Sequence, residues 1–271
     1  MCRLLKVSRS GYYEWSHRLP SKRDLENSQL LEEIKKSHAK SHQIYGVAKI
    51  HADVKEVVSC GKNRIHRIMK AYGIHSIRPR KYKATTNSRH NLPVAENLLQ
   101  QNFQTDHKNQ VFVSDISYIS TDEGWLYLAT VKDLWDKEIV GWAANKTMTK
   151  ELAMLALRRA IRKRALPSGV IHHSDRGVQY ASKDYQKLLT ENHFIPSMSR
   201  KGNCYDNACA ETFFSTIKNE LIHLKHFKTR EEARQAIFEY IEIFYNRQRR
   251  HEALNYLSPA EFRRRHMPKL A

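Results

Sequence analysis

Three acidic residues that lie far apart in the chain are candidate ligands of divalent metal ions. Asp115 interrupts the apolar stretch Phe-Val-Ser-Asp-Ile-Ser-Tyr, Asp175 follows a short apolar run, and Glu211 lies in a helical pattern. Two metal ions can clamp the attacking and leaving oxygens of a phosphodiester reaction. Mg²⁺ prefers carboxylate oxygens. We therefore expect Asp115, Asp175 and Glu211 to be catalytic and to hold two Mg²⁺ ions, with Mn²⁺ as the substitute metal.

Each acid taken alone also has an ordinary structural explanation. Strands are depleted in Asp, and an unpaired buried carboxylate is costly, so Asp115 needs either a metal or an ion pair with a lysine. Asp175 could be a turn or cap residue, and Glu211 could be an ordinary helix glutamate. The three acids together are more specific than any one of them.

Lys218 extends this set of candidate catalytic residues. It follows Glu211 by seven residues, which is about two helical turns, so both side chains project from one helix face. A cation in that place could hold a phosphate beside the metal ions.

The residues around the acids predict a mixed sheet flanked by helices. The β-rich segments 111–119, 125–131 and 138–143 are joined by short turns, which predicts an antiparallel meander. A helix from about 149 to 164 then allows a fourth strand at 170–172 to run parallel to the first. A helix at 183–192, a strand at 194–198, and helices from about 206 and at 230–245 complete the pattern. This order is typical of an α/β RNase H-like domain with a five-stranded sheet, expected over residues 109–245.

The front of the chain, residues 1–77, is expected to be an all-α domain. The segment 47–57 and a helix between Ser59 as N-cap and Gly73 as C-cap resemble a helix-turn-helix. The apolar stripe of the second helix, which includes Tyr72, is expected in the core. Its other faces carry the candidate DNA-binding residues Asn63, Arg64, Arg67 and Lys70. Residues 78–108 are interpreted as a basic linker and residues 246–271 as a basic tail.

The charge of the chain points to a polyanionic partner. The 271 residues include 47 Lys and Arg against 28 Asp and Glu, a formal net charge of +19. Residues 1–90 hold 20 of these basic residues against 7 acidic ones. Such a surplus argues against a small-molecule enzyme without a nucleic-acid partner. A solvated basic surface is the alternative.

Further residues near the acids are candidate DNA contacts. One is His173, two residues before Asp175. Three more lie in the loop before the helix that carries Glu211, namely Lys201, Asn203 and Asn207. The last two follow the final predicted helix, namely Arg247 and Arg250. A packed histidine and simple helix capping are the alternatives for the first four. The run Arg263–Arg265 could also follow DNA. Asp206 is interpreted as a helix N-cap, Asp133 and Asp136 as turn or surface residues, and four aromatic residues as core: Trp125, Trp142, Phe213 and Phe214.

Composition excludes several other classes of protein. No apolar run approaches the roughly 20 residues that cross a bilayer, and the basic start is not followed by a signal-peptide core. The 4 cysteines do not make a disulfide scaffold. We therefore expect no membrane partner and a location in a reducing cytosol.

Several strings in the chain are similar to the integrase-type core of bacterial insertion-sequence transposases. The resemblance is to the product of the second reading frame in elements with two overlapping frames, and it covers about residues 24–262. The 35 residues between Asp175 and Glu211, followed by Lys218, match the spacing of DDE recombinases. The other matching strings are Val113-Ser-Asp-Ile-Ser-Tyr118, Gly124-Trp-Leu-Tyr-Leu128, Ile139-Val-Gly-Trp142, His173-Ser-Asp-Arg-Gly-Val-Gln-Tyr180, Ser199-Arg-Lys-Gly-Asn-Cys-Tyr-Asp-Asn-Ala208, Phe244-Tyr-Asn-Arg247, Arg250-His251 and Ser258-Pro-Ala-Glu-Phe262.

This resemblance implies a Mg²⁺-dependent DNA transferase. Asp115, Asp175 and Glu211 correspond to the catalytic triad of the family, and Lys218 to its following basic residue. The family nicks the ends of its element and uses the freed 3′-hydroxyl for strand transfer. Double-stranded DNA, a second copy of the chain in the synaptic complex, and the upstream-frame product are the partners that it implies.

Two other functions remain as alternatives from the sequence. A DNA-binding regulator without catalysis could inhibit its own frameshifted fusion transposase, and the basic front would suffice for that. An RNase H-like nuclease would cleave DNA without joining ends. A serine or tyrosine recombinase would differ by forming a covalent protein–DNA adduct.

Overall fold

The chain divides into two compact units, which are described separately. A computed structural model describes residues 2–77, 93–200 and 204–267. The first unit is Met1–Ile77 and the second is Arg78–Ala271. The first part of the predicted linker, residues 78–92, lies outside the described residues. Across the described ranges, no helix has both the length and the apolar character needed to cross a lipid bilayer.

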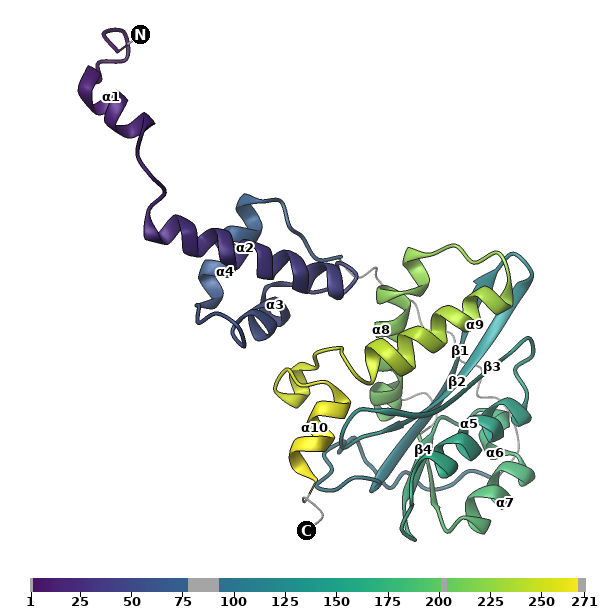
Figure 1. The fold of residues 1–271 in the computed structure, drawn as a ribbon. Coiled ribbons are helices and arrows are strands. Elements are labelled where there is room, and N and C mark those ends of the chain that lie inside the picture. Colours follow the sequence, from purple (N-terminus) through teal and green to yellow (C-terminus); the bar gives the residue numbers. More distant parts are fainter. Residues whose placement is uncertain (1, 78–92, 201–203, 268–271) are drawn as a thin grey trace. The chain divides into compact units, whose positions relative to one another are not determined.

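The first unit is helical, as predicted. Its helices are α1 (Arg9–Ser16), α2 (Lys22–Lys40), α3 (Val47–Val54) and α4 (Lys62–Ala71) (Figure 1). Ser21 begins α2 with a capping box, because its side chain accepts from the Asp24 backbone and the Asp24 carboxylate accepts from the Ser21 backbone. Leu30, Ile34 and Ile65 are fully buried and form part of the small core.

The boundaries of α4 differ from the prediction. Gly61 is the N-cap of this helix, whereas Ser59 lies before it. Tyr72 is 63% exposed because α4 ends at Ala71 and the backbone then leaves the helix. Gly73 takes a φ of +65° directly after this end, a conformation that glycine adopts at low cost. The predicted core position of Tyr72 is therefore wrong, and the stripe consists of Ile65, Ile68 and Met69.

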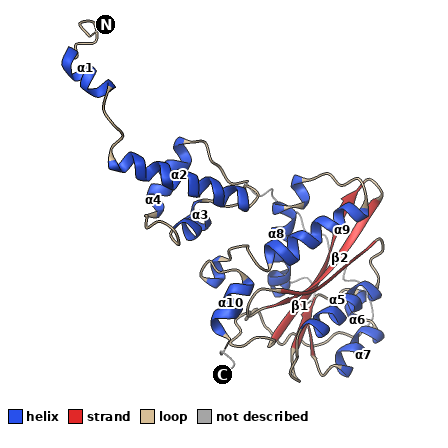
Figure 2. Ribbon diagram, in the orientation of Figure 1, coloured by secondary structure: helices blue, strands red, loops and turns tan. Residues whose placement is uncertain are grey.

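The described part of the second unit is built on a five-stranded sheet with the order β3-β2-β1-β4-β5 (Figure 2). β1 pairs antiparallel with β2 and β2 with β3, whereas β4 runs parallel to β1 and β5 parallel to β4. The predicted RNase H-like order of an antiparallel meander, a crossover helix and a parallel strand is thereby confirmed. The strands are β1 (Val111–Thr121), β2 (Gly124–Asp133), β3 (Ile139–Asn145), β4 (Ile171–Ser174) and β5 (Ile195–Met198).

Helices cover both faces of this sheet. One face carries α5 (Lys150–Lys163), α6 (Val178–Ala181) and α7 (Lys183–Glu191), and the other carries α8 (Ala208–Glu220) and α9 (Arg230–Phe238) (Figure 1). The first interface buries Phe112, Val140 and Leu157 among others. The second brings Ala210 of α8 against Val111 and Val113 of β1. A strand buried on both faces is therefore available to carry a site residue.

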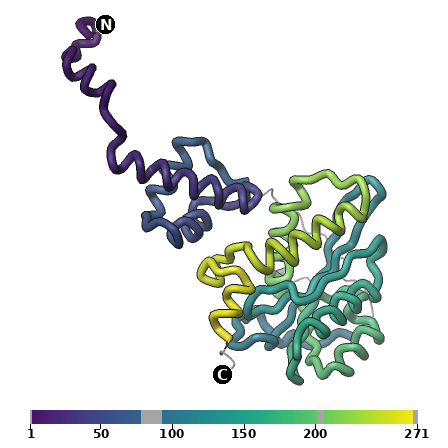
Figure 3. The backbone as a smooth tube through the Cα atoms, viewed as in Figure 1, coloured from purple at the N-terminus to yellow at the C-terminus, as the bar shows by residue number. Residues whose placement is uncertain are grey.

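The chain after α9 is ordered by internal contacts over its described part. The helix continues as π-helical turns over Glu239–Tyr245 and is followed by α10 (Pro259–His266), seen in yellow in Figure 3. Ser258 begins α10 with a capping box to Glu261. Arg263, predicted to follow DNA, instead forms an ion pair with Glu138 and lies 3.8 Å from Asp136. The sequence analysis missed this helix because its motif was interpreted only as a family signature.

Asp133 and Asp136 border the turn after β2, as expected, but they are buried and do not lie on the surface. Both are 0% exposed. The Asp133 carboxylate accepts hydrogen bonds from the Asn109 and Trp135 backbones at 3.0 Å each. The Asp136 carboxylate forms an ion pair with Arg164 at 2.7 Å. Because burial and Asp136 raise the pKa of Asp133, this cluster of like charges depends on the paired arginine.

The close packing of α5 on β3 gives a first testable prediction. A Cβ atom on Gly141 would lie 2.2 Å from the Ala156 backbone oxygen and 2.7 Å from the Ala160 backbone nitrogen. Gly141→Ala should lower the free energy of unfolding by about 1–3 kcal/mol, the usual cost of overpacking, measured by urea unfolding of the full chain.

Gly61→Ala is the control, because a Cβ atom there meets no heavy atom within 4 Å. The packing account would be contradicted if Gly141→Ala unfolded at the same urea concentration as Gly61→Ala.

Candidate active site

The register of two neighbouring strands brings Asp115 and Asp175 to the same place in the sheet. β1 and β4 run parallel, and their last paired residues are Ser114 and Ser174. Each of these serines is followed directly by its aspartate. Because neighbouring strands lie about 4.8 Å apart, the two aspartates start from adjacent backbone positions.

Helix α8 places Glu211 and Lys218 near the same strand. Ala210 packs against β1 and fixes the first turn of α8, which contains Glu211. Glu211 is exposed, whereas Lys218, two turns later, is only 6% exposed. The Lys218 Nζ lies 5.0 Å from the centre of the Tyr118 ring. The four predicted catalytic side chains thus come from β1, from the end of β4 and from α8.

The electrostatics of these groups show that the four side chains lie close enough to interact. Burial and the neighbouring charge of Asp175 raise the pKa of Asp115 well above its ordinary value, Glu211 contributes in the same direction, and Lys218 opposes them. Burial and Asp175 also raise the pKa of Glu211. Burial lowers the pKa of Lys218, against the attraction of Asp115. These carboxylates therefore repel one another, unlike acids that form ion pairs with a lysine or an arginine.

The carboxylates fit a divalent metal by their chemistry, although they do not form a closed set of ligands. Over the described parts of the chain, no group of three His, Cys, Asp or Glu side chains is close enough to hold an ion. The Asp115 Oδ1 accepts from the Ile116 backbone at 2.8 Å, and the Asp175 Oδ1 from the Gly177 backbone at 2.8 Å. Carboxylate oxygens are the ligands that Mg²⁺ favours. A bound cation would also offset the repulsion between these carboxylates.

Gly177 permits the tight loop after Asp175. A Cβ atom at this position would lie 2.9 Å from the Asp175 Oδ1. Any larger residue would displace the carboxylate or lengthen its bond to the backbone N–H. The sequence analysis did not assign Gly177 a role, although the string Asp175-Arg-Gly177 contained the signal.

His173 has a structural role instead of the predicted DNA contact. Its side chain is 0% exposed. Its Nδ1 lies 2.9 Å from the Ser197 Oγ, and its Nε2 lies 2.9 Å from the Asp206 backbone oxygen. Burial lowers the pKa of His173, so the ring is neutral near pH 7. It connects β4 to β5 and to the 3₁₀ turn Cys204–Asn207 before α8, and so it positions elements that carry two of the acids.

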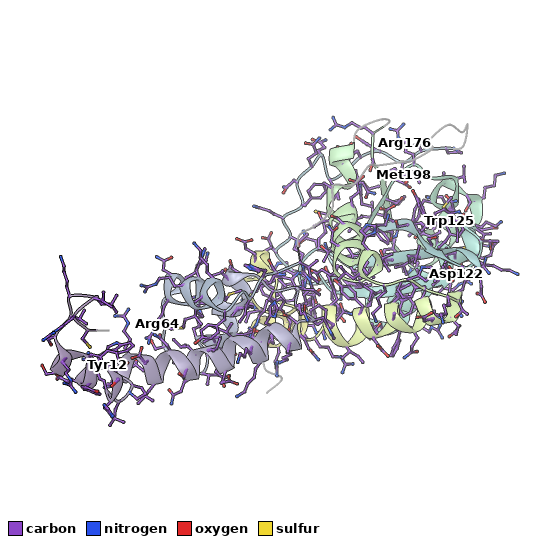
Figure 4. The ribbon with its side chains drawn as sticks, turned by 90° about the horizontal axis from the view of Figure 1, so that it is seen from above. Tyr12, Arg64, Asp122, Trp125, Arg176 and Met198 are labelled. Carbon is purple, nitrogen blue, oxygen red and sulfur yellow. The ribbon has the colours of Figure 1, made fainter. Side chains whose placement is uncertain are left out.

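Asp206 was expected to be the N-cap of α8, but the N-cap is Asn207. Asp206 is 0% exposed and accepts hydrogen bonds from the Arg200 backbone at 2.8 Å and from the Arg200 Nε at 3.0 Å. The Arg200 bond is the main reason that the pKa of Asp206 lies far below its ordinary value. Nearby, the Arg176 Nε donates to the Ser199 backbone oxygen at 2.6 Å, and Figure 4 shows Arg176 close to Met198.

The other predicted DNA contacts of the second unit have mixed outcomes. Lys201 and Asn203 lie outside the described residues. Asn207 is 6% exposed, which leaves little of its side chain for DNA. Arg250 is buried, donates to the Tyr256 backbone oxygen at 3.0 Å and pairs with Glu261, so its expected DNA contact is not supported. Arg247 is exposed.

In the first unit, α4 presents three of the four predicted DNA contacts to solvent. Asn63, Arg67 and Lys70 are exposed. Arg64 instead folds onto α2, where its Nη2 lies 3.0 Å from a Glu26 oxygen and its Nε donates to Asn27 at 2.9 Å. Arg64 therefore joins two helices, and its expected DNA contact is not supported.

Comparisons with known proteins agree with this architecture. Residues 105–204 and 211–267 match two families that are each described as an integrase core domain, and residues 25–82 match an HTH-like domain. Over 267 residues, the chain is 48% identical to the insertion element IS600 uncharacterized 31 kDa protein of Shigella sonnei, covering 98% of each. Over 270 residues, it is 40% identical to the transposase InsF for insertion sequence IS3A of Escherichia coli (strain K12), covering 98% of this chain and 94% of that protein.

Among solved structures, the HTLV-2 integrase catalytic core domain in complex with magnesium aligns with a TM-score of 0.44 and 15% identity. The alignment covers 57% of this chain and 95% of that one.

The repulsion at Asp115 predicts an unusual effect on stability. Since the pKa of Asp115 in the folded protein lies above its ordinary value of 3.8, charging Asp115 destabilises the folded state. In metal-free protein at pH 8, Asp115→Asn should raise the free energy of unfolding by about 1 kcal/mol or more, since one pKa unit corresponds to about 1.4 kcal/mol. This gain should shrink as the pH falls toward 4, because the wild type then becomes protonated. Urea unfolding in EDTA at several pH values measures both effects.

Asp184→Asn is the control with the opposite sign. A hydrogen bond from Lys150 lowers the pKa of Asp184, so this substitution should reduce stability at pH 8, and the loss should fade in acid. A stability loss in Asp115→Asn at pH 8 would contradict the electrostatic account.

Proposed function

The chain belongs to the family of insertion-sequence transposases with an integrase-type catalytic core, and from this membership we propose the residues that perform its reaction. It is thus a polynucleotidyl transferase that acts on DNA. We propose that Asp115, Asp175 and Glu211 hold two Mg²⁺ ions, which Mn²⁺ can replace, and that Lys218 contacts the reacting phosphate.

The observation that carries this proposal is geometric: β1 and β4 end their pairing directly before Asp115 and Asp175, and α8, which carries Glu211 and Lys218, packs on β1. Asp115 interacts with Asp175, Glu211 and Lys218, although they lie on separate segments of the chain. Repulsion between carboxylates lowers the stability of a fold unless cations offset it. In the buried cluster of Asp133, Asp136 and Glu138, arginines provide that offset. A bound cation would relieve the repulsion around Asp115, which explains why the acids are kept together.

The proposed reaction has two steps. Water first attacks a phosphodiester at the element end, the 3′-oxygen leaves and takes up a proton, and a free 3′-hydroxyl results. That hydroxyl then attacks a phosphodiester of the target, and a new P–O bond replaces the broken one. Bound metal ions would supply charge stabilisation and activate the attacking oxygen. The protein itself forms no covalent bond to DNA.

Lys218 would supply positive charge inside this site. Its ammonium is nearly buried, so its attraction for a phosphate is screened less than at an exposed position. Burial lowers its pKa while Asp115 raises it, and a phosphate nearby would further favour the charged form.

We also propose how the rest of the chain serves the reaction. The helix-turn-helix within residues 1–77 would bind duplex DNA through Asn63, Arg67 and Lys70, with the segment 78–108 as linker, 109–245 as catalytic core and 246–271 as a basic tail contributing Arg247. Joining of two element ends requires at least two chains in one complex. The upstream-frame product is a further proposed partner, and the nucleoid in the cytoplasm is the proposed location.

The acidic triad is tested by nicking and joining of element-end DNA with purified protein and Mg²⁺. Asp115→Asn and Glu211→Gln should each reduce both steps by about a hundredfold or more, since each loses a charged ligand in the transition state. Glu191→Gln, at an exposed acid that pairs with Lys187, is the matched control and should keep wild-type rates.

Full activity of either triad variant would refute the assignment. Cleavage without joining by the wild type would favour the nuclease alternative, and a trapped protein–DNA adduct would indicate a serine or tyrosine recombinase.

The helix-turn-helix assignment is tested by the salt dependence of duplex binding. Arg67→Ala should weaken binding and reduce the slope of log affinity against log salt by about one, the value expected for one lost phosphate contact. Lys36→Ala is the control, because this exposed lysine pairs with Glu33 on α2. An unchanged slope in Arg67→Ala would count against α4 as the helix that contacts the backbone.

A further inference from the structure

A concave site lies next to Lys218, which interacts with Asp115. It has a volume of about 380 Å³, within the usual range of ligand sites. Its wall comes from the β1–β2 hairpin on one side and from the chain between α8 and α9 on the other. The lining consists of Tyr118, Ser120, Thr121, Asp122, Trp125, Lys218, Ile222, His223, Lys225, His226 and Phe227.

Two exposed aromatic rings form one wall of this cavity. Tyr118 is 37% exposed and Trp125 is 50% exposed, so the expected core position of Trp125 is wrong. The two ring centres lie 5.0 Å apart at an interplanar angle of 81°. Figure 4 shows Trp125 and Asp122 at the same end of the second unit. A large indole that stays in solvent, instead of packing into the core, offers a flat surface to a ligand.

The hairpin that carries Trp125 is held in place by α9. The Arg230 Nε donates to the Trp125 backbone oxygen at 3.0 Å, and the Arg230 backbone N–H donates to Glu123 at 2.9 Å. The Asp122 backbone N–H donates to the Phe227 backbone oxygen at 3.1 Å. These bonds fix the turn residues Asp122 and Glu123 and the backbone of Trp125, so little backbone ordering is needed when a ligand binds.

The charge of the cavity favours a phosphate-containing ligand. Lys218 and Lys225 line it together with His223 and His226. Among the described residues of this lining, Asp122 is the one acid, and its carboxylate already lies 3.0 Å from the His226 Nε2. Aromatic rings combined with basic groups are the composition of sites that bind single-stranded nucleic acid.

The cavity shares Lys218 with the proposed catalytic residues. Lys218 lines the cavity and also interacts with Asp115. Tyr118 follows Asp115 by three residues of extended strand, or about 10 Å. The pairing of β4 with β1 ends at Ser114, just before this stretch. A DNA strand could therefore pass from the acids to the aromatic rings along β1.

We propose that this cavity binds one unpaired nucleotide of DNA next to the reacting phosphate. Its base stacks on Trp125 and Tyr118, and its phosphate faces Lys218 and Lys225. Bases in an intact duplex have covered faces, so the site selects a nucleotide that has left the stack at a frayed or opened end. This inference rests on the proposed function, because the proposed contact of Lys218 with the reacting phosphate is what places the cavity next to the reaction.

The test compares binding of two probes to the full chain in EDTA, where no cleavage occurs. One probe is a fluorescein-labelled oligothymidine and the other is a short random-sequence duplex, both measured by fluorescence anisotropy. Trp125→Ala should weaken oligothymidine binding about tenfold or more, as expected for one lost base stack, and duplex binding less than about twofold. Trp125→Phe keeps an aromatic face and should stay within about threefold of the wild type.

Trp15→Ala is the matched control, because Trp15 is 71% exposed on α1 and lies outside the cavity. It should bind both probes as the wild type does. Oligothymidine binding by Trp125→Ala equal to the wild type, equal losses for both probes, or a Trp125→Phe variant as weak as Trp125→Ala would each overturn the nucleotide site.

This outcome is separable from that of the proposed function. Binding in EDTA depends neither on metal ions nor on turnover. If Asp115→Asn is inactive while Trp125→Ala binds normally, the nucleotide site alone fails. If Asp115→Asn is active while Trp125→Ala loses oligothymidine binding, the catalytic assignment alone fails.

Discussion

The second unit has to accommodate acidic side chains that repel one another beside its central strand. Asp115 is placed by the central strand, Asp175 by the end of the neighbouring parallel strand, and Glu211 by the helix that packs over β1. Burial and mutual repulsion both raise the pKa of Asp115, so the surrounding fold must supply the stabilisation that this cluster lacks. The cation site that we propose would remove this repulsion.

Buried polar residues connect the elements that carry the acids. Neutral His173 bonds to Ser197 on β5 and to the backbone before α8, and Asp206 pairs with Arg200 in the same region. Further away, Asp136 and Arg164 form a buried ion pair that also draws in α10 through Arg263. The fold therefore fixes the end of β4, the start of α8 and the helix α10 relative to one sheet.

The sequence predicted the order of the elements and the pairing of the strands well, because hydrophobic period and turn residues are local signals. It could not separate polar residues that serve the fold from those that face DNA. His173, Arg64 and Arg250 have the residue types of DNA contacts, yet their partners, Ser197, Glu26 and Glu261, lie far away in the chain or on another element. Trp125 was misplaced for the converse reason, since a large aromatic in a strand is usually core.

The central claim is that the three acids share bound cations, and ion binding tests it most directly. Free Mn²⁺ can be measured by electron paramagnetic resonance while the full chain is titrated. The account predicts two bound Mn²⁺ ions per chain, and reduced binding in each of Asp115→Asn, Asp175→Asn and Glu211→Gln, with Glu191→Gln unchanged. Wild-type ion binding in any one of the three triad variants would show that the acids do not act as one site.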